Sequence, residues 1–181
     1  MKRVIITFLA GILISLNISA QSYYTEEGKA VFKSKVPLHN FTGTSENLVG
    51  MIKMEDMSVD FYLDLETLDT GNGKRDKDMK LTLETDKHPF GEFFGNITTD
   101  FDPESSEEQD VSVVGNFTIH GITQEVEIDG SLTVTDDGLL VKAAWILNLE
   151  DYEIKPPKLL FVKVDENQEI EIEALLKPTD E

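Results

Sequence analysis

The chain has 181 residues, a formal net charge of −19 and no cysteine. This length suits one domain with a core large enough to fold alone, and the absence of cysteine excludes disulfides and a lipid-anchored N-terminal cysteine. The excess of acidic residues argues against nucleic acid and anionic bilayer surfaces as partners, because both repel negative charge.

Residues 1–20 have the anatomy of a signal peptide. Lys2 and Arg3 precede the apolar run VIITFLAGILISL, and small residues follow it. A retained membrane anchor is the alternative, but the run is shorter than the about 20 apolar residues of a spanning helix. We therefore predict a cleaved signal peptide and one exported domain over residues 21–181. With both basic residues removed, 14 basic residues remain against 35 acidic ones, a net charge of −21.

Alternation of apolar and polar residues dominates the rest of the chain, which is typical of strands with one buried face. In GKAVFKSKV the three lysines share one phase, while Ala30, Phe32, Ser34 and Val36 share the other. Such runs cover residues 28–36, 47–54, 58–66, 93–101, 111–119, 122–134, 139–149 and 170–176. About eight strands joined by short turns indicate an all-β antiparallel sandwich or barrel.

One segment departs from this alternation. In KRDKDMKLTLET, residues 74–85, Met79 and Leu83 stand four residues apart. This spacing favours a short helix or an irregular crossover between two strands.

His120 is the histidine whose position raises the question of catalysis. It lies on the polar phase of its strand and precedes Gly121, where one strand ends and the next begins. Glycine suits a tight hairpin because it tolerates positive φ. His39 and His88 lie in other turns, and no spacing indicates a catalytic triad or a zinc site. We therefore interpret His120 as a turn residue whose ring bonds nearby backbone.

Several motifs together resemble the YceI-like family. The block VVGNFTIHGITQEVEI is similar to the family signature, and TGNGKRDKDM followed by DKHPFGEFFGNI is similar to its Arg-Asp stretch, crossover and Pro-x-x-x-Phe segment. Arg75, Asp76, Pro89 and Phe93 represent these motifs here. The resemblance covers nearly all of residues 21–181. It implies an eight-stranded lipocalin-like barrel, periplasmic or secreted, that holds a polyisoprenoid or another long apolar chain.

We therefore expect an exported carrier or binding protein rather than an enzyme, with no catalytic residue, cofactor or metal. Its partner would be an isoprenoid or other long-chain lipid, without nucleic acid and without stable membrane insertion. A lipid-modifying enzyme and a stress-related protein acting through its acidic surface are the alternatives. The residues expected to contact the ligand are apolar and lie on inward phases or near an entrance: Phe32, Phe41, Phe61, Leu63, Met79, Phe93, Ile97, Phe117, Trp145 and Leu147.

Two charged segments suggest weaker possibilities. Lys74 and Arg75 could meet an anionic head group, although pairing of Arg75 with Asp76 or Asp78 is the favoured interpretation. The acidic loop at residues 100–110 lacks the ligand order and central glycine of a calcium loop, so we interpret it as a solvated linker.

Four glycines share the apolar phase of their strands: Gly50, Gly95, Gly115 and Gly130. Such glycines either permit a bulge or bend or leave interior volume free. For Gly115 we favour the second interpretation, in which the position faces the cavity.

Overall fold

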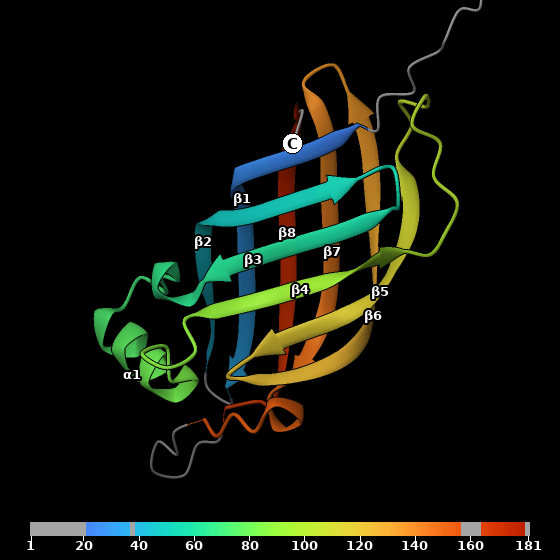
Figure 1. The fold of residues 1–181 in the computed structure, drawn as a ribbon. Helices are drawn as coiled ribbons and strands as arrows, with labels where there is room; N and C mark the ends of the chain where they lie inside the picture. The colour runs from blue at the N-terminus through green and yellow to red at the C-terminus, as the bar shows by residue number, and fades with distance from the viewer. Residues whose placement is uncertain (1–20, 37–38, 157–163, 180–181) are drawn as a thin grey trace, which may run out of the picture.

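The computed structural model describes residues 21–36, 39–156 and 164–179. The expected signal peptide, residues 1–20, lies outside the described residues. Eight antiparallel strands form a closed barrel in chain order (Figure 1), which confirms the predicted fold class. The strands are β1 (Ser22–Val36), β2 (His39–Lys53), β3 (Ser58–Asp64), β4 (Phe90–Ile97), β5 (Gln109–Ile119), β6 (Ile122–Thr135), β7 (Gly138–Asn148) and β8 (Asn167–Thr179).

The helices lie at one end of the barrel. The β3–β4 link contains the 3₁₀ helix η1 (Leu65–Thr67) and the α-helix α1 (Gly73–Leu83), and the β7–β8 link contains the 3₁₀ helix η2 (Leu149–Tyr152). We call this the helical end. Of the two alternatives predicted for residues 74–85, a short helix or an irregular crossover, α1 confirms the helix. At the opposite, terminal end, β1 begins and β8 ends (Figure 1).

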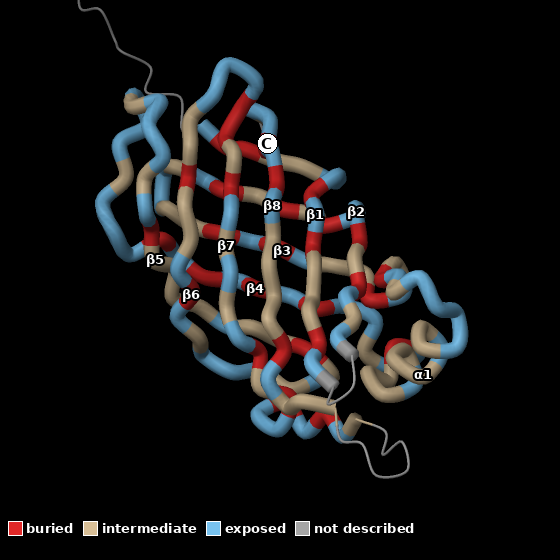
Figure 2. The backbone as a smooth tube through the Cα atoms, turned by 180° about the vertical axis from the view of Figure 1, so that it is seen from behind, coloured by how far each residue is buried: buried red, intermediate tan, exposed pale blue. Residues whose placement is uncertain are grey.

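Buried and more exposed residues alternate along the strands (Figure 2), because successive side chains of a strand point to opposite faces. In β4, for example, Gly91, Phe93, Gly95 and Ile97 are buried, while the residues between them are exposed. The first strand is longer than the sequence pattern indicates, because β1 begins at Ser22 and a register shift near Gly28 interrupts its alternation.

The first and last strands close the barrel with complementary charges. Outward lysines of β1 face outward glutamates of β8: Lys33 binds Glu171, and the Nζ of Lys35 lies 2.5 Å from a carboxylate oxygen of Glu169. One-residue slippage would turn every side chain of a strand to the other face. The lysine–glutamate pairs therefore favour the same strand register that places the apolar residues inside the barrel.

Two apolar clusters pack inside the barrel. At the terminal end, Tyr23, Leu139 and Leu176 pack into the larger cluster and are at most 6% exposed. At the helical end, Leu65 and Tyr152 bring η1 and η2 into a second cluster. Residues of both clusters line one cavity, which is the site of interest.

Candidate functional site

A cavity of about 690 Å³ lies inside the barrel. It extends from the inner faces of the strands to α1, and its wall includes the exposed Lys74 together with Pro156 and Val164 at the helical end. Leu139 and Leu176, both fully buried, lie beyond its wall at the terminal end. The cavity therefore has an apolar floor and reaches the surface beside α1. Its volume falls in the range of about 300–1,000 Å³ that is usual for ligand pockets.

All ten residues that the sequence predicts as ligand contacts line this cavity. Phe61, Phe93 and Ile97 are buried deep in its wall. Phe117 and Trp145 meet edge-on, with ring centres 5.8 Å apart. Their role in binding stays a prediction, but their common location gives the cavity an almost continuous apolar surface.

Two interior glycines of β2 lie beneath aromatic rings. A Cβ atom at Gly43 would lie 2.1 Å from the ring of Phe32, and one at Gly50 would lie 2.1 Å from the ring of Phe61. Each glycine is the cross-strand partner of that aromatic residue. The rings therefore cover positions without side chains, as in aromatic rescue of sheet glycines. A ring that lies along the wall in this way leaves the centre of the barrel open.

Gly95 and Gly115 have a different role, because they are cross-strand partners in β4 and β5. A Cβ atom at Gly115 would lie 2.4 Å from the carbonyl oxygen of Phe94 and 2.5 Å from the Cα of Gly95. Gly115 is also not among the residues that line the cavity. The expectation that Gly115 leaves cavity volume free is therefore wrong: the two glycines allow two backbones to approach closely.

Arg75 lies where α1 meets the cavity. The central carbon of its guanidinium is 4.4 Å from the centre of the Phe41 ring, and a cation over an aromatic face is favourable. Phe41 in turn meets Phe32 edge-on, with ring centres 6.0 Å apart. A positive charge is thus held against the aromatic rim of the cavity.

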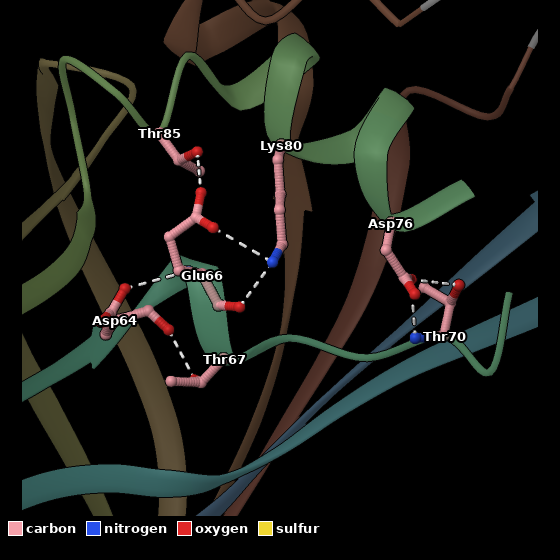
Figure 3. A network of polar contacts seen from close by, with 7 residues as sticks. All are labelled: Asp64, Glu66, Thr67, Thr70, Asp76, Lys80 and Thr85. Carbon is pink, nitrogen blue, oxygen red and sulfur yellow. Dashed lines mark hydrogen bonds and ion pairs between the residues drawn. The ribbon is translucent and has the colours of Figure 1, made fainter. Parts of the chain in front are cut away.

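The neighbouring carboxylates are occupied by other partners. Asp76 accepts hydrogen bonds from the backbone amide and the hydroxyl of Thr70, at 2.9 and 2.6 Å (Figure 3). The hydroxyl bond is the main reason that the pKa of Asp76 is lowered. Asp78 pairs with the Nζ of Lys74 at 2.6 Å. The prediction that Arg75 pairs with Asp76 or Asp78 is therefore wrong, because among the described residues these carboxylates bind other partners.

Polar contacts attach α1 to η1. The backbone carbonyl of Glu66 accepts a 2.7 Å hydrogen bond from the Nζ of Lys80, and its carboxylate binds the same Nζ at 3.1 Å (Figure 3). The Glu66 carboxylate also accepts a hydrogen bond from the hydroxyl of Thr85, which is the main cause of its lowered pKa. Because α1 has no fully buried residue, these contacts help to hold it over the barrel.

His120 is confirmed as a turn residue. His120 and Gly121 form the two-residue β5–β6 turn, with positive φ angles of 56° and 75°, as a type I′ hairpin requires. The Nδ1 of His120 lies 3.0 Å from the carbonyl oxygen of Tyr152 in η2. The rings of His120 and His88 pack edge-on, and the His120 Nε2 is 3.9 Å from a carboxylate oxygen of Glu84. Neither histidine lines the cavity.

The residues predicted from the sequence to contact the ligand did not include two buried polar residues of the cavity wall. Ser34 in β1 is 1% exposed and Gln168 in β8 is 6% exposed, and both line the cavity. The Nε2 of Gln168 donates to the carbonyl oxygen of Asp165. The hydroxyl of Ser34 has no hydrogen-bond partner among the described residues. The available signal was a polar residue on an apolar strand phase.

The described part of the chain has neither a metal-binding cluster nor a helix that could span a membrane. Its histidine, aspartate and glutamate side chains form no group of three or more that could hold a metal ion. None of the helices in these ranges combines the length and apolar character needed to cross a bilayer.

Comparisons with known proteins agree with this architecture. A family model described as the YceI-like domain matches residues 22–176. A polyisoprenoid-binding domain from Saccharophagus degradans, implicated in plant cell wall breakdown, has a TM-score of 0.75 at 14% identity, covering 88% of this chain and 99% of that chain. BcnA from Burkholderia cenocepacia has a TM-score of 0.68 at 13% identity, covering 82% and 94%. Among curated proteins, none matches the sequence.

Proposed function

This chain belongs to the YceI-like family, and we propose that it is a binding protein that holds the apolar chain of a polyisoprenoid or similar lipid inside its barrel. The observation that carries the proposal is the cavity of about 690 Å³ and its mostly apolar wall. Burial of a lipid chain there would contribute about 25 cal/mol per Å² of apolar surface. Few polar groups would fix the identity of the chain.

The structural neighbour from Saccharophagus degradans supports this ligand class, because it is described as a polyisoprenoid-binding domain. We do not extend the proposal to lipid modification. His88 and His120, the histidines that such an enzyme would use, lie outside the cavity wall.

Export forms the second part of the proposal. Residues 1–20 would direct the chain to the periplasm or the medium and be removed. An exported barrel could then carry a water-insoluble chain through an aqueous compartment. Cell fractionation and N-terminal sequencing of the purified protein test this part, and an uncleaved protein that stays in the cytoplasm would contradict it.

The ligand proposal is tested in two steps. First, the protein purified from its native host is extracted with organic solvent, and the retained molecule is identified by mass spectrometry. Second, long-chain isoprenoids are titrated while the fluorescence of Trp145 is followed. Trp145 lines the cavity, so a bound chain should change its emission in a saturable way.

Two adjacent alanines of β7 provide a matched pair of variants. Ala143 lines the cavity, whereas Ala144 is exposed on the outer face. Ala143→Phe should place a ring inside the cavity, where it obstructs a long chain, and weaken isoprenoid binding at least about tenfold, equivalent to about 1.4 kcal/mol. Ala144→Phe should bind as the wild type does. Circular dichroism checks that both variants keep the wild-type fold. If both then bound the isoprenoid with equal affinity, the ligand would lie outside the barrel.

A further inference from the structure

The hydroxyl of Ser34 is a buried polar group in a mostly apolar wall. We infer that this hydroxyl is the head-group contact of the cavity and binds a neutral oxygen atom, hydroxyl or carbonyl, at one end of the lipid. The inference rests on the proposed function and adds to it a ligand class and an orientation: the chain enters tail first, and its oxygen-bearing end stops near α1.

The position of Ser34 fixes this orientation. Its cross-strand partner in β2 is Phe41, which lies under Arg75 of α1. On its other side, the register of β1 and β8, continued one residue beyond its last pair, brings Ser34 next to Gln168. Ser34 therefore lies near the helical end, where the cavity reaches the surface. At the opposite end the cluster that includes Leu139 provides an apolar floor for the tail.

Burial makes the unpaired hydroxyl costly. Ser34 is 1% exposed, and no described residue bonds its Oγ. A buried polar group without a partner loses hydration and gains nothing in return. In contrast, Ser45 of β2 is 4% exposed, and its hydroxyl is 2.6 Å from the hydroxyl of Thr67. An unpaired hydroxyl in the wall of a large cavity is accounted for if the ligand supplies the partner.

A neutral oxygen suits this position better than a charged group. A serine hydroxyl supplies one donor and can also accept, which matches an alcohol or a carbonyl. An ionised head group buried at this depth would need a charged partner beside it. Arg75, a cation that lines the cavity, is instead held over the ring of Phe41, the cross-strand partner of Ser34. We therefore expect the charge of Arg75 to stay outside the head-group contact.

The test compares ligands that differ in the oxygen alone. Geranylgeraniol, the corresponding aldehyde and the oxygen-free hydrocarbon of the same skeleton are titrated into the wild type and into Ser34→Ala, Ser34→Thr and Ser45→Ala. Ratios of affinity between ligands cancel general effects on folding. In the wild type we expect the alcohol and the aldehyde to bind about tenfold more tightly than the hydrocarbon, the value of one good hydrogen bond.

Ser34→Ala should lose this preference while the affinity for the hydrocarbon stays unchanged, and Ser34→Thr should retain it. The melting temperature of ligand-free Ser34→Ala should rise by about 2–4 °C, because an unpaired buried group is removed. Ser45→Ala should show the reverse: an unchanged ratio and a lower melting temperature. A variant that loses ligand selectivity but gains stability, as expected for Ser34→Ala, has lost a ligand contact. A variant of a structural residue would lose stability and keep the selectivity.

Three outcomes would overturn the inference. An unchanged ratio in Ser34→Ala would mean that water satisfies the hydroxyl. Tighter, salt-sensitive binding of geranylgeranyl diphosphate that Ser34→Ala leaves intact would place a charged head group at Arg75. Binding of the alcohol and the hydrocarbon with equal affinity by the wild type would refute the head-group contact and leave the proposed function standing. If the wild type bound none of the probes, the proposed function would fail as well.

Discussion

Substitution of Gly115 by alanine tests how closely β4 and β5 pack. The added Cβ would lie 2.4 Å from the Phe94 carbonyl oxygen and 2.5 Å from the Gly95 Cα, whereas ordinary contact begins at 3.4 Å. The strands would therefore have to separate by about 1 Å, and both obstructing atoms belong to the backbone. We expect a loss of about 1–3 kcal/mol in the free energy of unfolding, the usual cost of overpacking.

Gly91→Ala is the matched control for this substitution. Gly91 lies in the adjacent strand β4 and is buried, whereas Gly115 is partly buried. A Cβ at Gly91 would meet a methyl carbon of Leu65 at 3.5 Å, an ordinary contact. Because glycine is about 0.5–1 kcal/mol less favourable than alanine within a strand, this variant should be as stable as the wild type or slightly more stable.

Urea unfolding, followed by tryptophan fluorescence and circular dichroism, measures both variants. Each kcal/mol corresponds to about 2–4 °C in melting temperature for a protein of this size, so thermal unfolding provides a second measurement. If Gly115→Ala proved as stable as Gly91→Ala, the close approach of β4 and β5 would not be the reason for glycine at this position.

Three further predictions concern the helical end. His120→Asn should cost about 1 kcal/mol of stability through loss of the hydrogen bond to the Tyr152 carbonyl, and lipid affinity should change at most a few-fold. Urea unfolding measures the stability and isoprenoid titration the affinity. Loss of a measurable hydrolytic activity in this variant would contradict the interpretation of His120 as a turn residue. Glu66 has a lowered pKa in the folded protein, chiefly through the Thr85 hydroxyl, so its stabilising contribution is complete above pH 4.5 and is lost as the pH falls through the lowered pKa. Glu66→Gln should therefore weaken the acid dependence of unfolding midpoints, and an identical dependence would contradict this role. Arg75→Met should leave the affinity for neutral isoprenoids unchanged at low and high salt, because the contacts are apolar; a steep fall of wild-type affinity with salt would show that charge dominates.

The sequence predicts those features that depend on local periodicity. Strand alternation identified the inward faces, and the spacing of Met79 and Leu83 indicated a short helix or an irregular crossover where α1 lies. Both patterns follow from the geometry of one element. The His120 turn was predictable for the same reason. Closure into a barrel came from the family resemblance, since alternation is equally compatible with a sandwich.

Features that depend on the pairing of distant segments were not predictable in this way. The role of Gly115 follows from its pairing with Gly95, which is known once the register of β4 and β5 is known. The partner of Arg75 likewise depends on β2, which brings Phe41 beneath α1. Ser34 carried a weak signal, but its significance rests on the lack of a partner within the described residues, and a sequence does not report this.

The seam between β1 and β8 has a consequence for how the molecule folds. Each of the other strand pairings joins two strands that are consecutive in the sequence, whereas the β1–β8 pairing joins the first strand to the last. Contacts between distant residues carry the largest loop-closure cost and slow folding. We therefore expect ring closure to be the late, rate-limiting step. Until it occurs, two unpaired strand edges stay exposed to other chains. Lysines along one edge and glutamates along the other would draw the two edges of one molecule together and make each edge repel its own copies.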